Sequence, residues 1–183
     1  MRLIATDFPG LYVIEPKVFQ DERGFFMESY NRAVFQAYGL NIDFQQDNHA
    51  RSERRGVLRG LHFQIPPFSQ TKLVRATRGS VHDVVADLRV GSPTYGKHFS
   101  VVLSAENFKM LLVPQGFAHG YQCLEDGTEI QYKVDSLYAP SHDRGLAWND
   151  PDLGIVWPVA NPVLSEKDSA LPGLKDFESP FRL

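Results

Sequence analysis

Short apolar runs recur along most of the chain, with turn-forming residues between them. The runs are rich in Val, Leu, Phe and Tyr, and several alternate apolar with polar positions, the period of a strand with one buried face. Turn signals such as TRGS, VGSPTYG, PQGF and EDGTE separate them. The predicted strands cover residues 11–19, 58–65, 72–79, 81–90, 98–104, 109–114, 119–124 and 129–138.

One segment interrupts this pattern with the spacing of a helix. Asn31 can cap it, apolar residues follow at 34, 35 and 38, and Gly39 is a stop signal. The last third of the chain has little periodicity, so we expect loops and short helical turns that wrap the strands. Short strands at this spacing are typical of an all-β sandwich or barrel. We therefore predict one all-β domain over residues 1–183, with a few short peripheral helices.

Composition and charge are those of a globular protein. Of the 183 residues, 43% are hydrophobic and 22% charged, far from the values of disordered or fibrous chains. The formal net charge is −3, so nothing in the overall charge favours a nucleic acid or an anionic membrane. Cys123 is the single cysteine, and no apolar run approaches the roughly 20 residues of a spanning helix. We expect a soluble, cytoplasmic protein.

The stretch GVLRGLHFQ, residues 56–64, contains the first candidate for chemistry. In a strand, His62 and Gln64 share one face, while Leu61 and Phe63 point to the other. A histidine here could bind a metal, accept a proton, or form hydrogen bonds within a barrel wall. The strand pattern alone favours the last of these.

The neighbours of His62 disfavour a metal site. Barrels of the cupin type often bind a metal through two histidines one residue apart, a glutamate and a later histidine. Here Gln64 stands at the second position, where it is a poor substitute for imidazole. The ammonium group of Lys72 has no lone pair to offer. We therefore expect the barrel, but no metal at His62 and His119.

Proton transfer is the second chemical alternative. A neutral imidazole is a suitable base for a carbon acid beside a carbonyl group. Such a base also needs an orienting carboxylate, a cation for the enolate oxygen and an acid that returns the proton. Asp168, Lys72 and Tyr132 are candidates for these roles. They lie far apart along the chain, so the sequence pattern alone does not place them together.

Nine motifs, in order, resemble one enzyme family over about residues 3–172. The family is that of the dTDP-4-dehydrorhamnose 3,5-epimerases, which invert C3 and C5 of a 4-keto-6-deoxy sugar attached to dTDP on the route to dTDP-L-rhamnose. The resemblance implies a cupin-type jelly-roll β-barrel, an isomerase activity and no cofactor. The motifs are EPKVFQDERGFFMESYN, FQQDNHARS, GVLRGLHFQ, KLVR, LSAEN, VPQGFAHG, YKV, AWNDPDLGIVWP and LSEKD.

The resemblance also implies a role for each candidate catalytic residue. His62 would accept the proton, with Asp168 as its partner. Tyr132 would donate a proton on the opposite face of the sugar, as inversion requires. Lys72 would hold O4 of the sugar and stabilise the charge of the enolate.

The residues that bind the dTDP-sugar are implied in the same way. Arginine suits phosphate because its planar group can bond two oxygens, and Tyr138 offers a stacking face. The family dimerises by pairing N-terminal strands, so residues 23–28 can serve the neighbouring subunit's site. The implied binding residues are Arg23, Phe26, Glu28, Gln46, Asp47, Asn48, Arg59, Lys72, His119, Tyr138, Asp143 and Lys167.

Two positions beside catalytic residues depart from the family pattern. Thr71 stands where glycine is usual, after an altered Pro-Pro loop. Gln131 stands before the tyrosine where an apolar residue is usual. We expect both to affect substrate preference more than the chemistry.

Three other functions are compatible with a barrel of this kind. The nearest is an epimerase that inverts one centre of a different dTDP-4-keto sugar, in antibiotic or surface-glycan synthesis. A metal-dependent cupin oxygenase is disfavoured by Gln64 and Lys72. A catalytically silent sugar-nucleotide binding protein is disfavoured by the presence of the four candidate catalytic residues, His62, Lys72, Tyr132 and Asp168.

Overall fold

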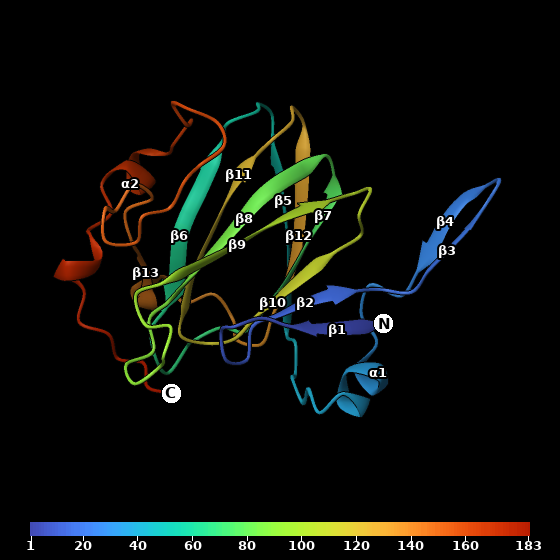
Figure 1. Ribbon diagram of the computed structural model, residues 1–183, viewed down its shortest axis with the longest axis horizontal. Coiled ribbons are helices and arrows are strands. Elements are labelled where there is room, and N and C mark those ends of the chain that lie inside the picture. Colours follow the sequence, from blue (N-terminus) through green and yellow to red (C-terminus); the bar gives the residue numbers. More distant parts are fainter.

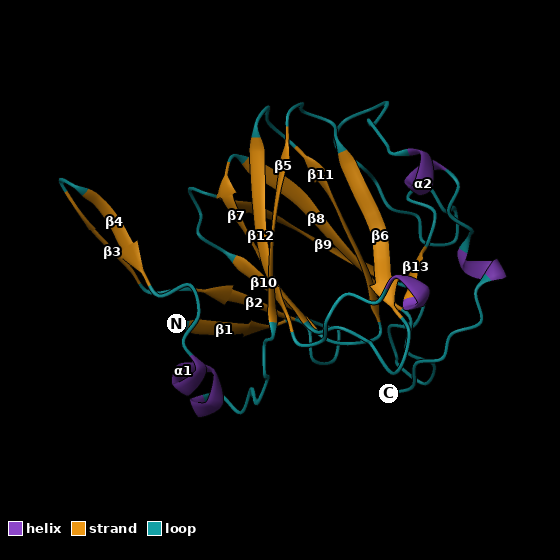
Figure 2. Cartoon of the chain, turned by 180° about the vertical axis from the view of Figure 1, so that it is seen from behind, coloured by secondary structure: helices purple, strands orange, loops and turns teal.

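Two antiparallel sheets face each other in the computed structural model, which describes residues 1–183 (Figures 1 and 2). The first sheet consists of β1 (Arg2–Ala5), β2 (Tyr12–Glu15), β5 (Gln46–Ser52), β7 (Lys72–Arg78), β10 (Met110–Val113) and β12 (Thr128–Val134). The second consists of β6 (Leu58–Gln64), β8 (Ser80–Asp87), β9 (His98–Ser104), β11 (Phe117–Cys123) and β13 (Asp143–Gly145). The remaining elements are β3 (Val18–Asp21), β4 (Gly24–Met27), α1 (Arg32–Ala37), α2 (Glu166–Ser169) and 3-10 turns at Pro140–His142 and Leu174–Asp176.

The order of the strands is that of a jelly-roll barrel. One sheet runs β1-β2-β10-β7-β12-β5 and the other β13-β6-β11-β8-β9, so strands distant in the chain become neighbours. This confirms the predicted all-β architecture with few short helices. No helix in the structure is long and apolar enough to cross a membrane.

The predicted strands from residue 58 onward are confirmed, with ends that differ by at most four residues. The prediction of a single strand over 11–19 is wrong. The chain forms β2 up to Glu15 and β3 from Val18, because Pro16 lacks the amide hydrogen that would continue the ladder. Beyond Pro16 the chain leaves the barrel, and β3 pairs with β4 in a hairpin that projects from the body (Figure 1).

The helix after the hairpin is confirmed with its predicted cap. The side chain of Asn31 accepts hydrogen bonds from the backbone of Ala33 and Val34, and Gly39 adopts a positive φ of 78° after the last turn. The strand pattern did not predict β1, β4, β5 and β13. The sequence of β5 is QDNHARS, so it lacks the apolar alternation of a half-buried strand. It nevertheless forms the edge of the first sheet, next to β12.

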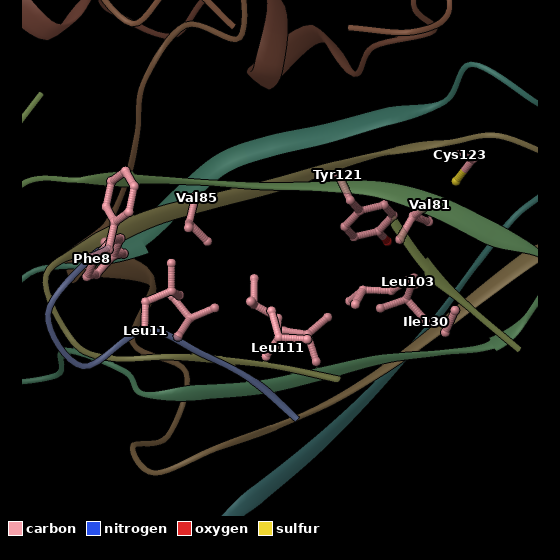
Figure 3. Packing of buried hydrophobic residues seen from close by; sticks show 14 residues of the cluster. Phe8, Leu11, Val81, Val85, Leu103, Leu111, Tyr121, Cys123 and Ile130 are labelled. Carbon is pink, nitrogen blue, oxygen red and sulfur yellow. The ribbon is translucent and has the colours of Figure 1, made fainter. Parts of the chain in front are cut away.

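Apolar side chains fill the space between the two sheets. Figure 3 shows Val85 and Tyr121 of one sheet facing Leu11 and Leu111 of the opposite side. The cluster has 14 buried residues, which include Cys123. Toward β5 and β6 the interior surface becomes polar, and this is where the candidate site lies.

Two strands of the second sheet approach unusually closely at a pair of glycines. A Cβ atom on Gly60 would lie 2.5 Å from the Cα atom of Gly120 and 2.8 Å from the carbonyl oxygen of His119. No side chain fits there, and Gly60 also has a positive φ of 124°. The close packing fixes the register in which His62 of β6 lies opposite His119 of β11.

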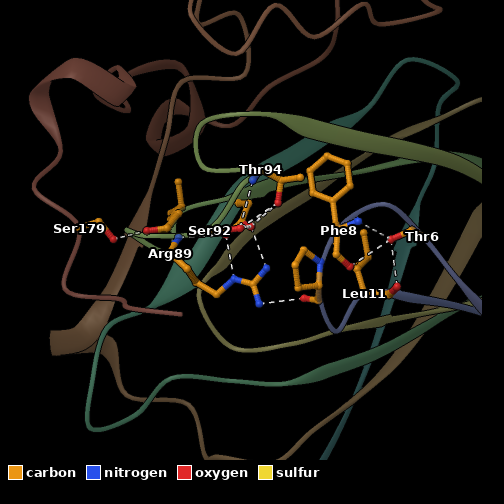
Figure 4. Close-up of polar contacts among 10 residues, drawn as sticks. Thr6, Phe8, Leu11, Arg89, Ser92, Thr94 and Ser179 are labelled. Carbon is orange, nitrogen blue, oxygen red and sulfur yellow. Dashed lines mark hydrogen bonds and ion pairs between the residues drawn. The ribbon is translucent and has the colours of Figure 1, made fainter.

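A buried ion pair fastens the end of β8 to the N-terminal segment. The guanidinium of Arg89 donates to both carboxylate oxygens of Asp87, at 2.8 and 2.7 Å, and to the carbonyl oxygen of Pro9 at 2.9 Å. Figure 4 shows Arg89 between the loop of Ser92 and Thr94 and the N-terminal turn. Burial raises the pKa of Asp87, but its hydrogen bonds to Arg89, Ser92 and Thr94 outweigh this and hold the pKa below its usual range.

Replacing Arg89 should therefore destabilise the fold strongly. In Arg89→Met the carboxylate of Asp87 stays buried without its cation, which typically costs about 3–5 kcal/mol. Urea unfolding measures the change. The control is Arg2→Met, because Arg2 forms an exposed ion pair with Glu15 and such pairs contribute little. Equal unfolding midpoints for the two variants would contradict the importance of the buried pair.

Candidate active site

A pocket of about 540 Å³ opens between the edges of the two sheets. Its walls come from β5, β6, β7, β11 and β12, and residues 163–168 of the C-terminal segment cover one side. The pocket brings together most of the predicted site residues. Those that line it are Gln46, Asn48, Arg59, His62, Lys72, His119, Tyr132, Tyr138, Asp143, Lys167 and Asp168.

His62 and Asp168 form a hydrogen-bonded pair across 106 residues of sequence. The ring Nε2 of His62 lies 2.5 Å from Oδ1 of Asp168, whose side chain is 5% exposed. α2 presents this carboxylate, and Ser165 caps the helix by accepting a hydrogen bond from the backbone amide of Asp168. Because a carboxylate only accepts, it holds the proton on Nε2 and leaves the lone pair on Nδ1.

The surroundings of His62 favour its neutral form. Burial lowers the pKa of the imidazole below its ordinary value of 6.5, and the nearby charge of Lys72 acts in the same direction. The charge and hydrogen bond of Asp168 raise the pKa and offset part of this effect. His62 is thus a neutral base near pH 7, and Asp168 can stabilise the imidazolium that forms when it accepts a proton.

Lys72 supplies a buried cation next to this base. Its side chain extends from β7, and Nζ donates a hydrogen bond of 3.3 Å to the backbone carbonyl of His62. Burial lowers the pKa of Lys72 to about 8, while the charges of Asp143 and Asp83 act in the opposite direction. An ammonium in such a low-dielectric site interacts strongly with a developing negative charge.

Tyr132 approaches the pocket from the opposite wall. It lies on β12 of the first sheet, whereas His62 lies on β6 of the second. Burial raises the pKa of its hydroxyl, and the nearby charge of Arg59 only partly offsets this. The hydroxyl therefore stays protonated near neutral pH and can donate a proton.

A second histidine–carboxylate pair lies in the same pocket. Nε2 of His119 is 3.0 Å from both carboxylate oxygens of Asp83, which is fully buried on β8. In the sequence, Asp83 alternates with apolar residues in VHDVVADLR, a pattern compatible with either a partner of a site residue or a solvated acid. The structure identifies it as the buried partner of His119. In the sequence, this role was indicated by an acidic residue at a strand position whose side chain faces the interior of the barrel.

The mouth of the pocket carries a linked set of polar side chains. The carboxylate Oδ2 of Asp143 accepts from Nζ of Lys167 at 2.5 Å and from the hydroxyl of Tyr138 at 3.3 Å. The hydrogen bond to Asp143 raises the pKa of Lys167, which keeps this ammonium charged. Gln46 accepts from the backbone amide of Tyr138 at 3.1 Å and donates to Asn48 at 2.8 Å.

Four of the predicted binding residues lie away from the pocket of their own chain. Asp47 points to the outer face of the sheet, where it pairs with Lys133 at 2.8 Å. The other three belong to the projecting hairpin and the turn after it. They are Arg23, paired with Asp21; Phe26, which is 67% exposed; and Glu28, which accepts a hydrogen bond from Asn31.

Neither departure from the family pattern reaches the pocket surface. The backbone amide of Thr71 donates to Asp135 at 2.6 Å. Gln131 accepts a hydrogen bond of 3.0 Å from the guanidinium of Arg75 on the outer face of the sheet. Thr71 therefore replaces a smaller residue and Gln131 replaces an apolar one, and both replacements lie outside the site.

The arrangement suits removal of a proton next to a carbonyl group. A neutral base, a buried cation and a protonated acid surround one cavity, and the base and acid come from opposite walls. Arg59, Lys72 and Lys167 add positive charge for an anionic ligand.

Comparison with known proteins assigns a family to this arrangement. The family model described as dTDP-4-dehydrorhamnose 3,5-epimerase matches residues 5–176. The dTDP-4-dehydrorhamnose 3,5-epimerase of Shigella flexneri is 52% identical over 169 residues, which cover 92% of this chain and 93% of that protein.

Solved structures agree with the sequence match. The dTDP-4-dehydrorhamnose 3,5-epimerase of Bacillus anthracis, crystallised with TDP and PPi bound, has a TM-score of 0.93 and 47% identity, covering 94% of this chain and 99% of that chain. The dTDP-6-deoxy-D-glucose-3,5-epimerase of Legionella pneumophila, in complex with dTDP-4-keto-L-rhamnose, has a TM-score of 0.94 and 40% identity, covering 100% of this chain and 98% of that chain.

We expect turnover to show a bell-shaped pH dependence set by His62 and Lys72. kcat/KM should rise with pH while His62 loses its proton, at a pKa lowered from 6.5. It should fall again as Lys72 loses its charge near pH 8.

The alkaline limb can be assigned with Lys72→Arg. Because arginine keeps its charge far above pH 8, the residual activity of this variant should lack the fall near pH 8. An unchanged alkaline limb in Lys72→Arg would show that another group titrates there. The measurement is kcat/KM from pH 5 to 10 for both proteins.

Proposed function

This chain belongs to the dTDP-4-dehydrorhamnose 3,5-epimerase family, and on that premise we propose how its pocket carries out the reaction. The enzyme is an isomerase that converts dTDP-4-dehydro-6-deoxy-D-glucose to dTDP-4-dehydro-L-rhamnose in dTDP-L-rhamnose synthesis. The observation that carries our assignment of roles is the pair of His62 with the buried Asp168, adjacent to Lys72.

His62 removes the protons at C3 and C5 of the sugar. Both carbons are next to the C4 ketone, so loss of either proton gives an enolate with its charge on O4. Lys72 stabilises that charge, and preorganised groups of this kind contribute about 10²–10³ in kcat. Asp168 stabilises the protonated imidazole. No electrons are transferred, so the chemistry calls for no redox cofactor.

Tyr132 returns a proton to the opposite face of each carbon, and between the two inversions His62 releases its proton to solvent and Tyr132 takes up a new one from solvent. Return from the side of His62 would restore the starting configuration, whereas a donor on the other wall inverts it. The opposed positions of β6 and β12 support this assignment. The raised pKa of Tyr132 supports it as well, because the donor must be protonated at neutral pH.

The nucleotide end of the substrate occupies the mouth of the pocket. Arg59, His119 and Lys167 bind the diphosphate, and Asn48 and the ring of Tyr138 contact the remainder of the dTDP moiety. These assignments rest on the family resemblance and on the position of each residue in the pocket lining.

The projecting hairpin completes the pocket of a second copy in a homodimer. Phe19, Phe25 and Phe26 expose between 52% and 67% of their surface on β3 and β4. Clustered apolar side chains of this kind are typical of an interface. We place Arg23, Phe26 and Glu28 against the partner's ligand. This location explains why the three residues do not meet their own pocket.

Incubation with dTDP-4-keto-6-deoxyglucose in D2O tests the function directly. We expect deuterium at both C3 and C5 and an NMR spectrum of the L-rhamno product, because each inversion takes its new proton from solvent. Inversion and exchange at one carbon alone would identify a single-centre epimerase instead. Binding of the nucleotide without exchange would contradict enzyme activity.

Replacing His62 and Tyr132 should produce different failures in the same assay. His62→Ala removes the base, so neither exchange nor inversion should survive. Tyr132→Phe keeps the base and the cation, so an enolate forms and His62 returns deuterium to the original face.

We therefore expect Tyr132→Phe to retain exchange without inversion, at least at C5. Normal inversion by Tyr132→Phe would show that another group is the acid. Exchange at the wild-type rate in His62→Ala would show that the base lies elsewhere. The outward-facing Gln131→Leu provides a control on the same strand, and it should exchange and invert as the wild type does.

A further inference from the structure

Gln64 is a buried amide that follows His62 by two residues on the same face of β6. Its side chain is in the lining of the pocket, but the residue is only 3% exposed. Nε2 donates to the backbone carbonyls of Phe68 at 2.7 Å and Leu137 at 3.1 Å. Oε1 accepts from the backbone amide of Ala139 at 2.7 Å. Both ends of the amide are thus bonded to main chain.

These three hydrogen bonds join two loops at the mouth of the pocket. Phe68 belongs to the loop 65–71, whereas Leu137 and Ala139 belong to the loop 135–139. Direct hydrogen bonds also join the loops: the side chain of Gln70, which lines the pocket too, donates to the carbonyl of Ser136 at 2.8 Å, and the backbone amide of Thr71 donates to Asp135 at 2.6 Å. Gln64 is the side chain that bonds to both loops at once.

Tyr138 lies between the two residues of the second loop that Gln64 holds. Its side chain reaches the pocket but remains largely exposed, at 56%. The ring therefore has little packing to fix it, and apart from the 3.3 Å hydrogen bond of its hydroxyl to Asp143 its position depends on the backbone of residues 137–139. Gln46 holds the amide of Tyr138, and Gln64 holds the groups on either side.

We propose that Gln64 is a positioning residue for Tyr138 and thereby sets the affinity for the nucleotide end of the ligand. The proposal rests on the function proposed above, in which Tyr138 contacts the dTDP moiety. Without the amide, three backbone groups lose their partners in a buried place, which is costly. The loops then shift to regain hydrogen bonds to water, and the ring moves with them. The groups that react with the sugar stay in place.

The test compares Gln64→Met with a matched control, Gln122→Met. Gln122 is a fully buried glutamine on β11, and its amide exchanges two hydrogen bonds with the backbone of Val159, outside the pocket. Both variants lose a buried amide, so both should lower the melting temperature. Only Gln64→Met should weaken dTDP binding, by about tenfold, the order of one lost base–aromatic stack. Its KM should rise similarly, with kcat within about threefold of wild type.

A double-mutant cycle shows whether Gln64 acts through Tyr138. In a Tyr138→Ala background, Gln64→Met should change the dTDP dissociation constant by less than about twofold, because the ring it positions is already absent. A full tenfold effect in that background would overturn the proposal and make Gln64 a direct ligand. Unchanged affinity in the single variant would overturn it too, and would leave Gln64 a purely structural residue.

Amide hydrogen exchange gives a readout that needs no ligand. The backbone amide of Ala139 should lose protection in Gln64→Met and keep it in Gln122→Met. If Gln64→Met does not fold, Gln64→Asn keeps an amide that is too short for all three bonds and serves in its place. Failure of the wild type to bind dTDP would contradict the proposed function, whereas wild-type binding with unaffected Gln64 variants contradicts this inference alone.

Discussion

A buried carboxylate must have a partner, and for Asp168 that partner is His62. Transfer of an unpaired carboxylate from water to the protein interior costs many kcal/mol, so the C-terminal segment can close over the barrel only in the arrangement in which these two side chains meet. The backbone reinforces this arrangement, since Val163 exchanges hydrogen bonds with Gly56 and Leu58. One contact therefore covers the pocket and also sets which nitrogen of His62 accepts a proton. The same 2.5 Å hydrogen bond thus serves the stability of the fold and, in the proposed mechanism, the chemistry.

The barrel provides what a single sheet could not, namely two walls that face each other across the pocket. One wall presents His62 and the other presents Tyr132. Lys72 lies on β7 of the same sheet as Tyr132, and burial lowers the pKa of its ammonium to about 8. The cost of burying this cation is tolerated because Asp143 and Asp83 lie near enough to favour its charge. The two acids therefore have second roles besides their contacts with Lys167 and His119.

The strands could be predicted where apolar and polar residues alternate, and β5 could not, because its inward-facing residues include Gln46 and Asn48. Because β5 was not predicted, the outward direction of the Asp47 side chain could not be predicted either. Once the strand is known, the alternation of side chains between its two faces gives that direction. The pairing of His62 with Asp168 spans 106 residues, and no local pattern carries such information. The family resemblance supplied it. For Gln64, the sequence provided only an argument against a metal site. Its three hydrogen bonds could not be predicted, because they depend on how two loops fold around it.

The projecting hairpin has a genetic consequence. If each pocket takes Arg23 from a neighbouring chain and His62 from its own, a mutation at Arg23 and a mutation at His62 can complement each other within a single gene. A mixed dimer of one chain lacking Arg23 and one lacking His62 would still contain one pocket with both residues intact. Two recessive alleles could then restore the phenotype in a cell that carries both, a behaviour that a self-contained barrel would not allow. Pro16, by directing the chain out of the sheet, would thus make an inactive copy useful to its neighbour.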